Sequence, residues 1–267
     1  MHRGFALPAL ALLWLLPCVA IAQGMLRLAT TTSTENSGLL RAVLPRFEAS
    51  SGLRVQVISV GTGKAMKLGE NGDVDVLLVH SRADEDRFVA QGFGVERRDV
   101  MYNDFVVVGP RSDPAKIAGM RDVLAAFRRI AETRSVFVSR GDDSGTDKME
   151  KSYWEMVGKR PEGRQYLSAG QGMGEVLTMA ANFEAYTLSD RATYGAYRPR
   201  IGLEILVEGD RRLFNPYGVI AVNPARYRDV NYAGAMQFIE WLTGVEGRRA
   251  IGEFRVNGEQ LFFPSAR

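Results

Sequence analysis

The chain has 267 residues, which suits two modest domains, and its 46% hydrophobic and 24% charged residues are typical of a folded globular protein rather than a disordered or fibrous one. A single cysteine and two histidines leave no intrachain disulfide and argue against Cys-based zinc sites, multi-His metal sites and His-dependent catalytic triads. The net charge of +3, with no long basic run, argues against a dedicated nucleic-acid binder.

The first 22 residues form a predicted signal peptide. Arg3 gives a basic start, residues 4–22 carry no charge, and Ala20 and Ala22 supply the small residues that a signal peptidase reads. Cys18 follows a proline where a lipoprotein signal has a small residue, so we expect no lipid anchor there. The mature chain is then expected to be an exported, periplasmic protein that depends on core burial alone for its stability.

Strands and helices alternate along the rest of the chain. Short apolar runs predict strands, and apolar stripes at helical spacing predict helices. The expected strands are residues 25–30, 53–60, 73–79, 102–109, 135–138, 203–207 and 217–222, and the expected helices lie around 39–47, 123–130, 149–157, 176–180 and 238–242. This alternation predicts largely parallel sheets covered by helices on both faces. No long linker is visible, so two domains would be joined by strands that cross between them.

A run of five hydroxyl residues, 30–34, follows the first predicted strand and precedes a helix. Ligands of open α/β sheets bind beyond the carboxyl ends of strands, where helix starts offer unpaired backbone N–H groups. Ser and Thr also cap helices, but five in a row exceed what a cap requires. We therefore expect Thr31, Thr32 and Ser33 to contact a ligand.

A glycine-rich turn, residues 61–64, follows the second long strand. It is not a nucleotide P-loop, because Ile58 stands where the first glycine of that motif belongs and Ala65 replaces its final Ser or Thr. Its glycines still let backbone N–H groups approach an anion, so Thr62 and Gly63 are candidate ligand-binding residues. A tight strand–helix turn is an equally good interpretation of this fragment.

A third polar cluster, residues 139–146, lies between a strand and a helix. Arg140 can direct two N–H groups onto an oxyanion, and Ser144 and Thr146 lie at the helix start, where they can donate. Asp142 and Asp143 would orient Arg140 or cap the helix, and capping with solvent contact is the simpler interpretation. His80 ends a strand near these clusters and is predicted to be a wall residue rather than a ligand.

Six segments together resemble the periplasmic tungstate-binding proteins, the solute-binding subunits of tungstate ABC importers. They are TTTSTENSGLL (30–40), VGTGKAMKLGENGDVDVLLVHSR (60–82), VMYNDFVVVGP (100–110), SRGDDSGTDK (139–148), AYTLSDRATY (185–194) and LFNPYGVIAVNP (213–224). The resemblance spans nearly all of the mature chain. One departure is Asp147, where relatives often carry His, and it changes the local charge at the helix start.

The resemblance implies a type II periplasmic-binding-protein fold, with two α/β lobes that close on a ligand like a hinge. We place the crossover strands near residues 102–106 and 214–218. Lobe one is then 25–104 plus 214–267, and lobe two is 105–213. The resemblance further implies no catalytic residue, no metal cation and no cofactor, in a monomer that hands its anion to a membrane permease.

The expected ligand is tungstate or molybdate, a tetrahedral dianion whose four oxygens only accept hydrogen bonds. Phosphate or sulfate is the alternative within this class, because Asp142 or Asp143 could accept the proton of hydrogen phosphate. An enzyme on the same fold, such as a phosphoryl hydrolase, is disfavoured because the mature chain has no cysteine, one histidine and no two-metal carboxylate cluster. A sensor domain is disfavoured because the sequence shows no second hydrophobic span and no signalling domain.

Overall fold

The structure is a computed structural model that describes residues 24–266, so the signal peptide predicted for residues 1–22 lies outside the described residues. The strands are β1 (Met25–Thr31), β2 (Arg54–Val60), β3 (Val76–Val79), β4 (Gly94–Pro110), β5 (Phe137–Ser139), β6 (Tyr166–Ser168), β7 (Thr187–Asp190), β8 (Leu203–Val207), β9 (Phe214–Val222) and β10 (Phe263–Pro264). The α-helices are α1 (Thr32–Asn36), α2 (Leu39–Ser51), α3 (Thr62–Asn71), α4 (Arg82–Ala90), α5 (Val123–Glu132), α6 (Gly145–Val157), α7 (Met173–Asn182), α8 (Arg191–Tyr197), α9 (Tyr232–Thr243) and α10 (Val245–Glu253). Within residues 24–266, no helix is long and apolar enough to span a bilayer.

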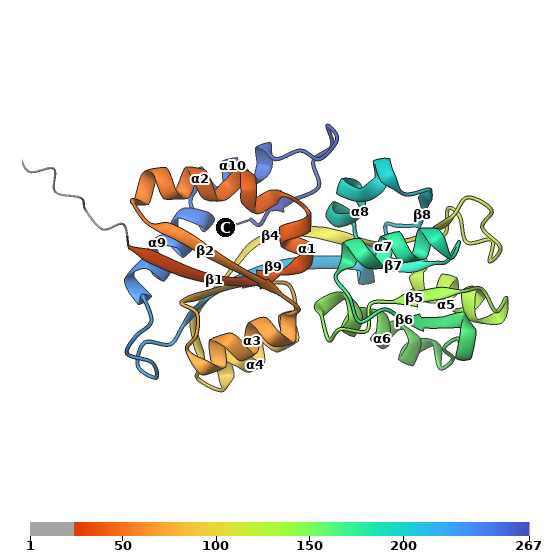
Figure 1. Ribbon diagram of the computed structural model, residues 1–267, viewed down its shortest axis with the longest axis horizontal. Coiled ribbons are helices and arrows are strands. Elements are labelled where there is room, and N and C mark those ends of the chain that lie inside the picture. The colour runs from red at the N-terminus through yellow and green to blue at the C-terminus, as the bar shows by residue number, and fades with distance from the viewer. Residues whose placement is uncertain (1–23, 267) are drawn as a thin grey trace, which may run out of the picture.

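Two α/β lobes lie side by side and share the long strand β4 (Figure 1). In the first, called lobe one, the strand order is β2-β1-β3-β9-β4-β10. In the second, lobe two, β7 and β8 pair with β4, and β5 pairs with β6. A bridge between Phe137 and Tyr186 joins β5 to the β7 side, which extends that sheet. Each lobe therefore has its own sheet, and β4 belongs to both.

Each sheet is covered on both faces, and each face has its own apolar core. In lobe one, α2, α9 and α10 pack on one face around residues such as Leu28 and Phe238, and α3 and α4 pack on the other around Phe88. In lobe two, α5 and α6 pack around Phe127, and α7 and α8 pack around Val176. Each lobe therefore has two apolar cores, one on each face of its sheet.

The expectation of largely parallel sheets is wrong for the strands that join the lobes. β1 is parallel to β2 and β3, but β9 is antiparallel to β3 and β4, and β7, β8 and β10 are antiparallel to β4. Apolar periodicity reports burial and not strand direction. β4 also begins at Gly94, whereas the sequence predicted its start near residue 102. The prediction started late because charged residues 96–99 interrupt the apolar pattern, at the point where the register between β4 and β9 shifts.

Strands β4 and β9 run antiparallel between the lobes. Asn103 pairs with Asn215 and Asp104 pairs with Phe214, and from Phe105 onward β4 pairs with β7 instead. The chain therefore passes between the lobes on two adjacent strands, and the ends of β1, β2, β5 and β7 face each other beside them (Figure 1).

Candidate functional site

Three hydrogen bonds join the polar loops of the two lobes. Arg140 Nη2 donates to Thr32 Oγ1 at 2.7 Å, the Gly145 backbone N–H donates to Thr62 Oγ1 at 3.1 Å, and Thr193 Oγ1 donates to the Ser33 carbonyl oxygen at 3.2 Å. The short helix α1 of lobe one also packs against α7 and α8 of lobe two (Figure 1). The structure is thus a closed state, in which residues far apart in the sequence meet at one place.

The guanidinium of Arg140 lies at the centre of this contact, and the residue is 2% exposed. Its Nε donates to Asp142 Oδ2 at 3.1 Å, and its Nη2 pairs with the same oxygen at 3.1 Å. Its Nη1 is buried and has no hydrogen-bond partner among the described residues, and the same is true of Thr146 Oγ1. Buried donors without partners are unfavourable by about 1–3 kcal/mol each, so both indicate an acceptor that the protein itself does not supply.

Asp147, singled out only as a departure from the family pattern, holds the Arg140 loop in shape. Its Oδ1 accepts from the Gly141 backbone N–H at 2.9 Å, and its Oδ2 accepts from the Asp143 N–H at 3.2 Å and from Lys151 Nζ at 2.6 Å. Lys151 compensates the buried negative charge. Gly141 has φ +64°, a conformation that favours glycine, and an added Cβ would collide with Ser168.

The two aspartates of the loop have different surroundings. Asp142 orients Arg140 through Oδ2 and accepts from the Ser144 N–H through Oδ1 at 3.1 Å. Asp143 is exposed, with φ +59°, and the nearest cation is Lys148 at 3.7 Å. Its carboxylate lies against Gly63 of lobe one, and a Cβ added at Gly63 would collide with Asp143 Oδ2. Ser144 caps α6 by accepting from the Asp147 N–H at 3.2 Å.

The predicted hydroxyls of lobe one separate into two groups. Thr32 and Thr62 each accept a hydrogen bond from lobe two, and Thr32 is half-buried while Thr62 is fully buried. Thr31 and Ser33 point instead into lobe one: Thr31 Oγ1 lies 3.0 Å from Ser33 Oγ and caps α1 at the Thr34 N–H, at 3.3 Å. Of the predicted residues, Thr32, Thr62 and Arg140 make interlobe hydrogen bonds through their side chains, Ser33 makes one through its carbonyl, and Gly63 lies against Asp143. Ser144 and Thr146 flank Gly145, whose N–H donates to Thr62.

His80 is a buried wall residue, 5% exposed, and its ring stacks on Tyr217 at 4.8 Å. Burial lowers the pKa of the imidazole from 6.5 to about 4, so the ring is neutral at physiological pH. Asp190, at the end of β7, is a site residue that was not predicted from the sequence. Its Oδ1 accepts from the Thr193 N–H at 2.8 Å, its Oδ2 has no partner in the described chain, and burial raises the pKa of its carboxyl.

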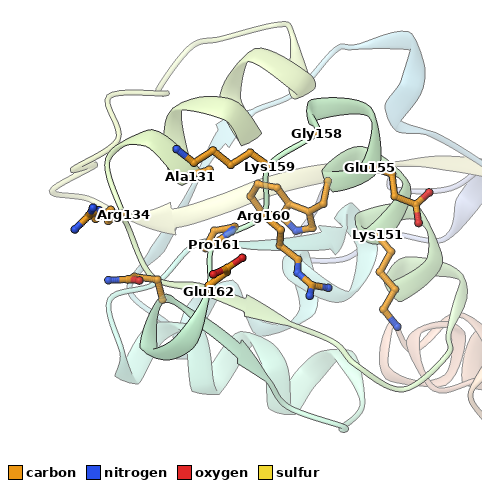
Figure 2. A pocket seen from close by; sticks show the side chains of 11 residues that line it. Ala131, Arg134, Lys151, Glu155, Gly158, Lys159, Arg160, Pro161 and Glu162 are labelled. Atoms are coloured by element: carbon orange, nitrogen blue, oxygen red, sulfur yellow. The ribbon is translucent and has the colours of Figure 1, made fainter.

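The described residues contain no group of three or more His, Cys, Asp or Glu side chains that could hold a metal ion. A hollow of about 840 Å³ lies on the outer surface of lobe two beside α5 and α6 (Figure 2). Arg134, Lys151 and Arg160 line it, and Lys151 Nζ donates to Asp147 Oδ2. The candidate site is therefore the closed contact between the lobes.

Two sheet-based lobes that close over a donor-rich cleft define a solute-binding protein. The family model described as the PBP superfamily domain matches residues 21–246, and the chain belongs to that superfamily. Within it, the chain belongs to the family of the tungstate-binding proteins. It is 49% identical over 249 residues to the tungstate-binding protein TupA of Peptoclostridium acidaminophilum, an alignment that covers 92% of this chain and 87% of the relative.

Two solved structures of this family are similar along most of the chain. One is described as the tungstate ABC transporter from Geobacter sulfurreducens; it is 52% identical with a TM-score of 0.80, and the match covers 86% of this chain and 98% of that one. The other is the tungstate binding protein TupA from Desulfovibrio alaskensis; it is 46% identical with a TM-score of 0.78, and the match covers 91% of this chain and 100% of that one. Both likenesses exceed what a shared fold alone requires.

Proposed function

We propose that this protein binds tungstate between its two lobes and delivers it to an ABC importer. The observation that carries the proposal is the pair of buried atoms without partners, Arg140 Nη1 and Thr146 Oγ1, beside the interlobe hydroxyls Thr32 and Thr62. All four are donors or can donate. A fully deprotonated tetrahedral dianion offers acceptors in every direction, which matches such a set. The names of the relatives support tungstate in particular.

The proposed ligand-binding residues are Thr32, Thr62, Gly63, Arg140, Ser144 and Thr146, with Thr31 and Ser33 shaping the loop behind them. The charge of Arg140 is offset by Asp142, so the site does not neutralise a dianion with cations. Oriented dipoles can do so instead: α3 and α6 both begin at the cleft, where the N-terminal ends of helices favour negative charge.

We assign residues 25–104 and 214–267 to lobe one and residues 105–213 to lobe two, with β4 and β9 as the hinge. An anion that touches both lobes binds the closed state better than the open state and therefore drives closure. Lys148 of α6 supports closure, because its Nζ reaches Asp84 Oδ2 of α4 across the cleft at 2.6 Å. We propose that the closed monomer is recognised in the periplasm by a membrane permease.

The protein is a binding protein and not an enzyme, in line with its solute-binding relatives. Phosphate is disfavoured at the Arg140 loop because both oxygens of Asp142 already accept internal hydrogen bonds and the Asp143 side chain is mostly exposed. Unless Asp190 Oδ2, which is buried without a partner in the described chain, accepts it, the O–H group of hydrogen phosphate would lack an acceptor there, which is unfavourable by about 1–3 kcal/mol. Molybdate has the same charge and shape as tungstate and stays a candidate ligand.

A thermal-shift series tests the proposal. A ligand that binds only the folded state raises the melting temperature, so tungstate should raise it by several degrees, and nucleotides and sugars should leave it unchanged. Molybdate, sulfate and phosphate complete the series. If none of the four oxyanions shifted the transition, the proposed function would be wrong. If phosphate bound within tenfold of tungstate, the argument from missing acceptors would be wrong.

A further inference from the structure

A chain of buried hydrogen bonds connects the hinge strands to the hydroxyl loop of lobe one. On β9, Asn215 Nδ2 donates to Asn103 Oδ1 on β4 at 2.7 Å. That bond turns Asn215 Oδ1, an acceptor only, toward His80 Nδ1 at 3.0 Å. With the Asn103 and Asn215 amides in this orientation, the Nδ1 atom carries the proton and donates it. Because the buried ring is neutral, Nε2 carries no proton and can only accept.

The direction of the remaining bonds follows from that tautomer. Ser33 Oγ lies 3.1 Å from His80 Nε2, so the Ser33 hydroxyl must donate to the ring. Ser33 Oγ then accepts from Thr31 Oγ1 at 3.0 Å, and Thr31 Oγ1 accepts from the Thr34 hydroxyl at 2.7 Å. Every hydroxyl proton of Thr31, Ser33 and Thr34 is thus used inside lobe one, and the three residues are fully buried.

Thr32, in the middle of the same loop, is different. Its Oγ1 accepts from Arg140 Nη2, and its own proton has no acceptor in the described part of the chain. Thr62 Oγ1 likewise accepts from the Gly145 N–H and keeps its proton. Both hydroxyls lie between the lobes, where the anion is proposed to bind.

We propose that His80 is a positioning residue that orders the protons of this loop, so that Thr32 and Thr62, and not Thr31 or Ser33, donate hydroxyl protons to the anion. The inference rests on the proposed function for the identity of the ligand. It also gives His80 a mechanical role, because its two nitrogens tie Ser33 of this loop to Asn215 on β9, which in turn bonds to Asn103 on β4. The opposite tautomer would require the Asn215 amide to be turned over.

Nitrogen-15 NMR of the histidine-labelled protein tests the tautomer directly. His2 is the only other histidine, so a His80→Gln variant assigns the His80 signals by subtraction. We expect a neutral ring at pH 7 with a protonated Nδ1 and an unprotonated Nε2, both with and without tungstate. A protonated Nε2, or an imidazolium, would overturn the inference.

Calorimetric titration with tungstate tests the consequence for binding. Ser33→Ala should weaken binding by less than about threefold, because its proton does not reach the anion, whereas Thr32→Ala should weaken it about five- to tenfold, the value of one neutral hydrogen bond. His80→Phe removes both nitrogens, while His80→Gln can keep an acceptor for Ser33 and a donor for Asn215. Binding should fall in His80→Phe and recover in His80→Gln, and adding Ser33→Ala to His80→Phe should cause no further loss.

Thr32→Ala is the matched control, and its loss should add to that of His80→Phe. If Ser33→Ala weakened tungstate binding as much as Thr32→Ala does, the inference would fail although the proposed function stood. If the unmutated protein bound no oxyanion, the proposed function would fail, and the NMR result would still show which nitrogen carries the proton.

Discussion

Replacement of Arg140 by alanine is expected to weaken tungstate binding more than any other single substitution in the site. The side chain is 2% exposed, holds Thr32 of the opposite lobe at 2.7 Å, and keeps one buried nitrogen for the anion. A hydrogen bond to a charged partner contributes about 1.5–3 kcal/mol, and the variant loses the anion contact together with one interlobe contact. The expected loss is about 3 kcal/mol or more, which exceeds a hundredfold in Kd.

Isothermal titration with tungstate measures this loss, and two variants serve as controls. Arg140→Lys keeps the charge but loses the planar fork, so it should recover only part of the affinity. Arg160→Ala changes an arginine of the same lobe that lines the outer hollow (Figure 2), and it should bind like the parent. Without ligand, Arg140→Ala should melt within a few degrees of the parent, because Asp142 stays partly solvated. If Arg140→Ala bound tungstate like the parent, the site would be misplaced.

Asp147→Ala should lower the free energy of unfolding by about 2–4 kcal/mol, because two backbone N–H groups and Lys151 lose a fully buried partner. Urea unfolding measures this loss, and a change below about 0.5 kcal/mol would contradict the role assigned to Asp147. Lys148→Met should weaken tungstate binding a few-fold and should reduce the dependence of binding on salt, since the bond between Lys148 and Asp84 joins the two lobes. Titrations at low and high ionic strength check this. An unchanged Kd at both would argue against a role of this ion pair in closure. The third prediction concerns pH. Because the pKa of His80 is about 4 in the folded protein against 6.5 ordinarily, the unfolded chain binds more protons between these values, and stability falls as the pH falls through that window, by up to about 3 kcal/mol. Between pH 7 and pH 4, the free energy of unfolding should therefore change less with pH in His80→Gln than in the parent. The same pH dependence in both proteins would refute the pKa assigned to His80.

The sequence predicted the parts of the fold that depend on local patterns. Strands β1, β2 and β5 are visible in the sequence as apolar runs, and the polar clusters that follow them lie close together in the structure. The antiparallel course of β4 and β9 was not predictable, because periodicity is the same in either direction. The charged residues 96–99 concealed the first half of β4, since they lie where the strand is irregular and partly exposed.

The candidate site divides in the same way. Arg140 could be found because an arginine between a strand end and a helix start has few structural roles. The function of Asp147 could not, because its partners are backbone N–H groups of a loop whose shape the sequence does not state. His80 and Asn215 are 135 positions apart, and the pairing of β3 with β9 brings them together. Contacts between lobes require the topology, which no local pattern contains.

A crystal structure of the protein grown with tungstate, with the tungsten located by its anomalous scattering, tests the central claim most directly. We expect one tungsten atom between the lobes, with oxygens within hydrogen-bond distance of Arg140 Nη1 and Thr146 Oγ1, two buried atoms that lack partners in the described chain. Tungsten found only on the outer surface of lobe two, or absent from between the lobes in a closed molecule, would contradict the account.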